Sequence, residues 1–143
     1  MSAKEAKARI KINKMLEESG WRFFDDISGK ANISLESHVK ISVKDIDTFG
    51  ENFEKVKRGF IDFLLLDEKR FPIIILEAKS EDKNPLVGKE QARSYAQSQN
   101  CRFIILSNGN IHYFWDVEHG NPQIISRFPT PESIKKYTEF QPN

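Results

Sequence analysis

Two apolar segments separated by a short polar link constrain the fold more than any other feature of this chain. The segments cover residues 59–66 and 71–79, and four charged residues at positions 67–70 separate them. Apolar runs of this length, joined by so short a polar connection, predict an antiparallel β-hairpin. We therefore expect these residues to form two neighbouring strands of a largely apolar sheet.

Three charged side chains interrupt the two apolar strands. Asp62 lies in the first strand, and Glu77 and Lys79 lie in the second. If the hairpin is centred between Lys69 and Arg70, Asp62 falls directly opposite Glu77, and such opposed residues have Cβ atoms about 4.5–5.5 Å apart. Lys79 is two residues from Glu77, so it points from the same face of the sheet. The sequence thus predicts two carboxylates and a lysine on one patch.

The two carboxylates are costly to bring together unless something neutralises them, because like charges repel and burial increases the cost. A divalent cation bound by Asp62 and Glu77 would remove this cost. Oxygen ligands favour magnesium, calcium or manganese, and the main-chain carbonyl of Ala78 offers a further oxygen. A water on such an ion becomes a nucleophile near neutral pH, and Lys79 would orient it or stabilise charge on a phosphate. The pattern favours metal-assisted phosphodiester hydrolysis, and the alternative is three ordinary surface charges.

The same residues resemble a known nuclease motif. Asp62 followed by Glu77-Ala78-Lys79 is similar to the active-site pattern of the PD-(D/E)XK nuclease superfamily, with Ile61 in place of the proline in that name. Other segments resemble, in the same order, the N-terminal nuclease domain of type I restriction enzyme R (motor) subunits, and only residues 25–57 lie outside the resemblance. The matching segments are residues 5–9, residues 16–21 with their Gly-Trp ending, residues 91–96 (Gln-x-x-x-Tyr), residues 108–116 and residues 128–132.

The resemblance implies an α/β fold of the restriction-endonuclease type, with a mixed sheet flanked by helices. It also implies cleavage of double-stranded DNA with Mg²⁺ or Mn²⁺, with Gln91 at the metal site or on a DNA phosphate and Tyr95 supporting it. Glu5 becomes a further candidate metal ligand, and Arg9 would pair with Glu5 or contact phosphate. The residues alone favour helix surface for Gln91 and core packing for Tyr95, and they leave Glu5 open as a first-turn acid favoured by the helix dipole.

The resemblance also has consequences for domains and partners. In that family the domain is joined to an ATP-driven helicase motor and assembles with modification and specificity subunits, so ATP and S-adenosylmethionine would act only through other domains or subunits. We expect an endonuclease domain at residues 1–121 and a proline-containing tail at residues 122–143 that leads toward a motor. Two alternatives stay open. One is a stand-alone nuclease of the same fold in DNA repair or defence, and the other is a catalytically silent DNA-binding or subunit-docking module.

Composition narrows the class of protein. A chain of 143 residues with 38% hydrophobic and 30% charged residues is typical of one globular domain with a sizeable core. A single cysteine, Cys101, excludes an intramolecular disulfide and favours a reducing, cytoplasmic location. No apolar run is long enough to cross a membrane. The three histidines lack zinc spacing, and we expect them at the surface or in loops; they are His38, His112 and His119.

The remaining pattern predicts an order of helix, strand, strand, helix, strand, strand. Apolar residues recur at helical spacing near the N-terminus, where Gly20 would end the helix. A Ser-Asn-Gly-Asn sequence at residues 107–110 predicts a tight turn between the last two strands. The expected helices are 3–19, 85–99 and a short one near 132–137, and the expected strands beyond the hairpin are 101–106, 111–116 and one within 37–44.

Overall fold

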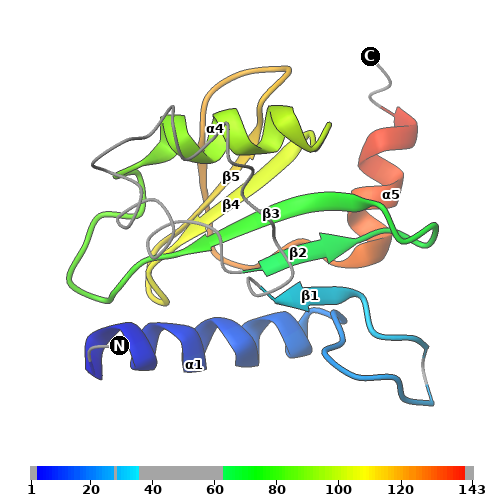
Figure 1. Cartoon of the computed structure of the whole chain (residues 1–143), viewed down its shortest axis with the longest axis horizontal. Helices are drawn as coiled ribbons and strands as arrows, with labels where there is room; N and C mark the ends of the chain where they lie inside the picture. The colour runs from blue at the N-terminus through cyan, green and yellow to red at the C-terminus, as the bar shows by residue number, and fades with distance from the viewer. Residues whose placement is uncertain (1–2, 28, 36–62, 141–143) are drawn as a thin grey trace, which may run out of the picture.

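A computed structural model describes residues 3–27, 29–35 and 63–140. These residues form a six-stranded sheet with helices on both faces (Figure 1). The α/β class and the mixed sheet predicted from the sequence are confirmed. In chain order the elements are α1 (Ala3–Glu18), β1 (Ile33–Leu35), β2 (Phe63–Leu66), β3 (Pro72–Ala78), α4 (Lys89–Ser98), β4 (Phe103–Ser107), β5 (His112–Asp116), β6 (Gln123–Ile125) and α5 (Pro131–Phe140).

The strands lie in the sheet in the order in which they occur in the chain. Neighbouring strands are antiparallel except for β3 and β4, which are parallel. Parallel neighbours need a long crossover connection, and α4 supplies it. As a result, the C-terminal ends of β3 and β4 lie side by side at one edge of the sheet, next to the loop that leads into α4 (Figure 1).

The β2–β3 hairpin has the predicted register over most of its length. Close to the turn the register shifts by one residue, because the side-chain oxygen of Asp67 holds the turn by accepting hydrogen bonds from the main-chain N–H groups of Lys69 and Phe71 at 2.9 and 3.0 Å. Asp62 lies outside the described residues, so its pairing with Glu77 stays a prediction. The described pairs are Phe63 with Leu76, Leu64 with Ile75, Leu65 with Ile74 and, after the shift, Leu66 with Pro72.

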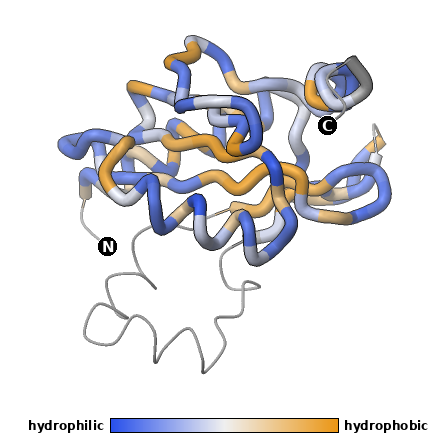
Figure 2. Tube along the Cα trace, turned by 90° about the horizontal axis from the view of Figure 1, so that it is seen from above, coloured by the Kyte–Doolittle hydropathy of each residue, from blue (hydrophilic) through white to orange (hydrophobic). Residues whose placement is uncertain are grey.

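Alternation along the strands divides the core into two layers. On one face, residues such as Ile74 and Leu76 pack against α1 and α5, and on the other face Ile75 and its neighbours pack against α4. Figure 1 shows α1 and α4 on opposite sides of the sheet, and Figure 2 shows the hydrophobic residues concentrated along the central strands. Burial on both faces explains why these strands are almost continuously apolar.

Helix α1 matches the sequence prediction closely. Ala8, Ile12 and Leu16 recur at a spacing of four and are fully buried. Gly20 has φ of 95° and ends the helix, with hydrogen bonds from Gly20 N to Glu17 O at 3.1 Å and from Trp21 N to Leu16 O at 3.0 Å. This is the Schellman arrangement, in which a left-handed glycine satisfies the last helical carbonyls.

Helix α4 begins later than the sequence predicted. The expected helix started at Pro85, whereas residues 85–88 form turns and α4 starts at Lys89. The reason is Gly88, whose left-handed backbone (φ 85°) interrupts helical geometry immediately before the helix. The helix prediction is therefore right in type and wrong in its first residue.

Part of the expected tail contributes to the fold. Strand β6 pairs with β5, and Ile134 of α5 is buried in the same core as α1. Thr130 caps α5 by accepting a hydrogen bond from Ser133 N at 3.0 Å, and Trp21 Nε1 donates to Pro129 O at 2.8 Å. Whether residues 122–143 also lead to a motor stays a prediction, and the strand expected within residues 37–44 lies outside the described residues. No helix among the described residues is long and apolar enough to cross a membrane.

Candidate active site

Glu77 is a fully buried carboxylate near the C-terminal end of β3. It lies two residues after Ile75, so it belongs to the face of the sheet that α4 covers. The strand pairs in parallel with β4, with Glu77 beside Leu106 and Ala78 beside Ser107. A carboxylate in such surroundings is costly unless a charge or a metal compensates for it.

Lys79 supplies part of that compensation. Its Nζ lies 2.7 Å from Glu77 Oε1, and its side chain is only 14% exposed. The predicted convergence of Glu77 and Lys79 on one face is therefore present. A buried ion pair contributes little net stability, because desolvation offsets most of the attraction. An ion pair at the end of a strand that is otherwise apolar favours a chemical role.

Gln91 reaches the same point from α4. A Cβ atom on Gly88 would lie 3.5 Å from each of three atoms: Gln91 Oε1, Glu77 Oε1 and Lys79 Nζ. The three side chains thus surround one small space, which is left open because residue 88 has no side chain. Gly88 is also the N-cap of α4, and its carbonyl accepts a hydrogen bond from Gln91 N at 3.1 Å. Gly88 therefore leaves room between the three side chains and also begins the turn of α4 that carries Gln91.

Tyr95 lies one helical turn beyond Gln91. It is half-buried and packs against the apolar cluster beneath α4, which includes Ile75 and Trp115. This packing fixes the helix on the sheet and so fixes where Gln91 points. The sequence left open whether Tyr95 supports the site or packs in the core. Tyr95 packs against the core, and through α4 this packing also helps to set the position of Gln91.

The donors at this point suit a hard divalent cation. The Glu77 carboxylate is buried there, and oxygen atoms are the ligands that Mg²⁺ and Mn²⁺ take; the carbonyl of Ala78 as a further ligand stays a prediction. No group of three or more His, Cys, Asp or Glu side chains gathers as a metal site among the side chains that the structure describes. Asp62 lies outside that set, so its role as a second carboxylate ligand stays a prediction.

The N-terminal half of α1 approaches the same edge of the sheet. A Cβ atom on Gly109, in the turn after β4, would lie 3.1 Å from Ala8 Cα, so the helix and the turn touch through their backbones. Arg9 is half-buried on this helix, and the side chain of Glu5 is not described. The helix body lies on the face opposite Glu77, so contact of Glu5 or Arg9 with the site stays a prediction.

Ion pairs join α1 to the loop that follows Lys79. Lys11 Nζ donates to Glu81 Oε2 and to Asn110 Oδ1, the latter at 2.8 Å, and Lys4 Nζ lies 3.5 Å from Asp82 Oδ2. The hydrogen bond from Lys11 lowers the pKa of the Glu81 carboxyl below its usual range. The loop is therefore tied to α1 close to the ends of β3 and β4.

Sequence reasoning missed a buried polar pair beside the site. His112, expected at the surface or in a loop, is only 6% exposed, so that prediction is wrong for this residue. Its Nδ1 lies 2.7 Å from the hydroxyl of Ser107, which is fully buried, and burial lowers the pKa of His112. His119 is exposed as expected, and His38 lies outside the described residues. The only signal in the sequence was the polar turn at residues 107–110.

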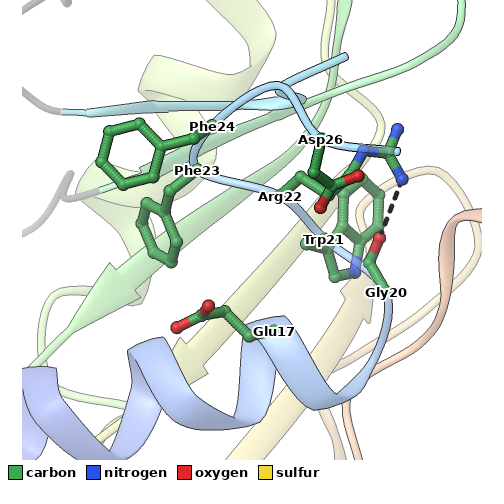
Figure 3. A pocket seen from close by; sticks show the side chains of 7 residues that line it. All are labelled: Glu17, Gly20, Trp21, Arg22, Phe23, Phe24 and Asp26. Carbon is green, nitrogen blue, oxygen red and sulfur yellow. Dashed lines mark hydrogen bonds between the residues drawn. The ribbon is translucent and has the colours of Figure 1, made fainter. Parts of the chain in front are cut away.

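A separate pocket lies at the other end of α1, where the chain runs from Gly20 to Asp26 (Figure 3). Its volume is about 220 Å³, and Phe24 beside it is 81% exposed. None of the predicted site residues lines it. We therefore place the candidate active site at Glu77, Lys79 and Gln91.

Comparisons with known proteins bear on this geometry. A family model described as type I restriction enzyme R protein N terminus (HSDR_N) matches residues 30–129, a range that contains Asp62, Glu77, Lys79 and Gln91. The chain is also similar to a solved fragment from Vibrio vulnificus YJ016 that is assigned as an HsdR subunit of a type I restriction enzyme. The two are 28% identical with a TM-score of 0.62, and the match covers 95% of this chain and 25% of that one. The chain thus spans about a quarter of the length of that relative, and the comparison with curated proteins gave no match.

Proposed function

The chain belongs to the family of type I restriction enzyme R protein N termini, and on that premise we propose that it is the metal-dependent nuclease domain of such an R subunit. Its substrate would be the phosphodiester bonds of double-stranded DNA. The observation that carries the proposal is the convergence of Glu77, Lys79 and Gln91 around the space left by Gly88. A buried acid, a lysine and an amide in one place suit phosphate chemistry better than they suit a structural core.

Glu77 and Asp62 would hold the metal ion, with the carbonyl of Ala78 as a further ligand and Glu5 as a candidate. Asp62 directly precedes Phe63, which pairs with Leu76, so the same register continued by one residue would put Asp62 opposite Glu77. When bound, Mg²⁺ or Mn²⁺ supplies a water of lowered pKa and stabilises charge on the phosphate. Two opposed carboxylates would ligate the ion, and the ion would in turn neutralise their charges, which are costly to bury without compensation.

Lys79 and Gln91 would act on the reacting groups and leave metal binding to the carboxylates. Lysine has three donors and no acceptor, so it cannot ligate a cation. Its Nζ lies 2.7 Å from Glu77 Oε1, and it would orient the attacking water or stabilise charge developing on the phosphate. Gln91 has both a donor and an acceptor, and it would hold the water or a DNA phosphate oxygen from the other side. Arg9 would contact the DNA backbone.

Other parts of the enzyme would supply the remaining functions. We propose that a helicase motor follows in the same protein, and that modification and specificity subunits assemble with it. The size of the relative supports this, because the chain corresponds to only a quarter of that protein. ATP and S-adenosylmethionine would then act through those parts. A stand-alone nuclease of the same fold would instead cleave DNA without any partner subunit.

The proposal is tested by cleavage of supercoiled plasmid with and without Mg²⁺, by the isolated chain and by the assembled R subunit. Glu77→Gln and Lys79→Gln should each lower cleavage about a hundredfold or more, because charge stabilisation worth several kcal/mol is lost and each 1.4 kcal/mol is tenfold in rate. ATP hydrolysis by the assembled enzyme should continue in both. Glu90→Gln is the matched control, since Glu90 lies on α4 with an exposed side chain. Full cleavage by Glu77→Gln, or loss of ATP hydrolysis with cleavage, would refute the proposed function.

Metal binding gives a readout that does not depend on cleavage. Thermal stability of the wild type should rise with Mg²⁺ or Mn²⁺ concentration as mass action requires. Lys79→Gln should keep this response, and Asp62→Ala and Glu77→Gln should lose it. Equal stabilisation of the wild type and Asp62→Ala would show that these carboxylates do not hold the ion.

A further inference from the structure

The end of β4 is hydrogen-bonded to the main chain of Lys79. Lys79 N donates a hydrogen bond to the carbonyl of Ser107 at 2.8 Å, one residue beyond the last paired position of β3. Ser107 is fully buried, and it is the last residue of β4. The orientation of its peptide therefore decides where the chain carrying Lys79 leaves the sheet.

Two hydrogen bonds fix the Ser107 hydroxyl. Its oxygen accepts from Gly109 N at 3.0 Å and lies 2.7 Å from His112 Nδ1. The serine hydroxyl has one hydrogen to donate and two lone pairs, so with Gly109 N–H bound it is still able either to donate to Nδ1 or to accept from an Nδ1–H group. A neutral imidazole agrees with the burial of His112, which lowers its pKa. The serine hydroxyl is thus held between the Gly109 amide and the His112 ring.

The same turn also holds the far end of the loop. Asn108 Nδ2 donates to Lys83 O at 2.9 Å, while Asn108 Oδ1 accepts from Asn110 N and Ile111 N at 2.9 and 2.8 Å. The loop from Lys79 to Lys83 is therefore pinned at both ends by residues 107 and 108. The described link between this arrangement and the site is the main-chain hydrogen bond from Lys79 to Ser107.

We propose that Ser107 and His112 are positioning residues for Lys79, which they hold at Glu77 by fixing the end of β4. The effect on catalysis depends on the proposed function, whereas the hydrogen bonds that hold Lys79 do not. Displacement of a reacting group by about 1 Å can cost about a hundredfold in rate, which is why one buried hydrogen bond beside a site matters. Neither residue would contact DNA or the metal.

The structure separates the hydrogen bond of His112 from the packing of its ring. The ring lies edge-on to Phe128, with centroids 5.0 Å apart. His112→Phe keeps an aromatic ring there but removes the hydrogen-bond partner of the Ser107 hydroxyl. His112→Asn removes the ring but puts a side-chain amide, which can donate or accept, near the position of Nδ1. A positioning role and a packing role therefore predict opposite rankings of the two variants.

The experiment compares kcat, KM and the exchange rate of the Lys79 amide hydrogen in the two variants, with His119→Phe as an exposed control. We expect His112→Phe to lower kcat of the assembled enzyme about 10- to 100-fold with KM for DNA nearly unchanged, because only the reacting geometry is altered. Amide exchange at Lys79 should rise about tenfold or more, since this hydrogen bond then opens more easily. In His112→Asn, kcat and the exchange rate at Lys79 should both lie close to the wild-type values. His119→Phe should change neither kcat nor the exchange rate.

The two readouts separate failure of this inference from failure of the proposed function. If the wild type binds no metal and cleaves nothing, the nuclease assignment fails, while faster Lys79 exchange in His112→Phe and its recovery in His112→Asn still support the positioning role. If His112→Phe behaves as the wild type in both readouts, or if His112→Asn is the more damaged variant, ring packing is what matters and the inference is wrong.

Discussion

Replacing Gly109 by alanine should destabilise the protein more than the same change at Gly120, and the difference measures how tightly α1 is pressed against the sheet edge. Both glycines have positive φ, 90° and 150° respectively. A Cβ atom on Gly109 would lie 3.1 Å from Ala8 Cα and 3.3 Å from Ala8 O, whereas one on Gly120 would meet nothing within 4 Å. Gly120→Ala therefore carries backbone strain alone, and Gly109→Ala carries strain together with an unusually tight contact to the helix backbone.

The magnitudes follow from those two contributions. Strain at a positive φ costs about 1–3 kcal/mol, so we expect that loss of unfolding free energy for Gly120→Ala. Forcing an extra methyl group against a helix backbone costs about a further 1–3 kcal/mol, because neither Ala8 atom belongs to a flexible side chain. For a domain of this size each kcal/mol corresponds to about 4 °C in Tm.

The assay is urea unfolding of both variants and the wild type, with thermal melts as a second measure. The slopes with urea should agree between variants, so that differences in midpoint report stability. A Gly109→Ala variant no less stable than Gly120→Ala would refute the reasoning, because it would mean that α1 is free to move away from the turn. Rescue by shortening Ala8 to glycine would not be expected, since the contacts involve the backbone of residue 8.

Two further predictions concern His112 and Gly88. Burial lowers the pKa of His112, so the unfolded chain binds a proton at this residue more readily than the folded chain does, and the free energy of unfolding should fall as pH drops below about 6.5. Urea titrations between pH 7 and 5 should show a smaller fall for His112→Phe than for the wild type. Equal falls in the two proteins would contradict this prediction. Gly88→Ala should cost about 1–3 kcal/mol through its positive φ. Its methyl group would also enter the space between the three site side chains, so plasmid cleavage should fall even at temperatures where circular dichroism shows the variant fully folded, and unchanged cleavage would argue against that site.

Elements set by local signals were readable from the sequence. The hairpin register follows from two apolar runs and a short polar link, and the described pair Phe63–Leu76 agrees with it. Helix α1 follows from the spacing of Ala8, Ile12 and Leu16, and its end follows from Gly20, because only glycine takes a left-handed backbone without strain. Glu77 and Lys79 were brought to one face by alternation along a strand, which is also a local property.

Features that depend on contacts between distant segments were not readable in the same way. Four strands (β2, β3, β4 and β5), the crossover helix, and the acid–lysine pair at the end of β3 were determined by the sequence itself, because period and turn chemistry act over a few residues. Only the tertiary structure decided that Gln91 Oε1 faces Glu77 and Lys79 across Gly88, that β6 and α5 join the same sheet and core, and that His112 is buried. The surroundings of His112 come from β4 and from the segment before α5, and nothing in the residues next to it specifies either. Burial of a single polar side chain is a property of the whole packed core, which forms only when segments far apart in the chain meet.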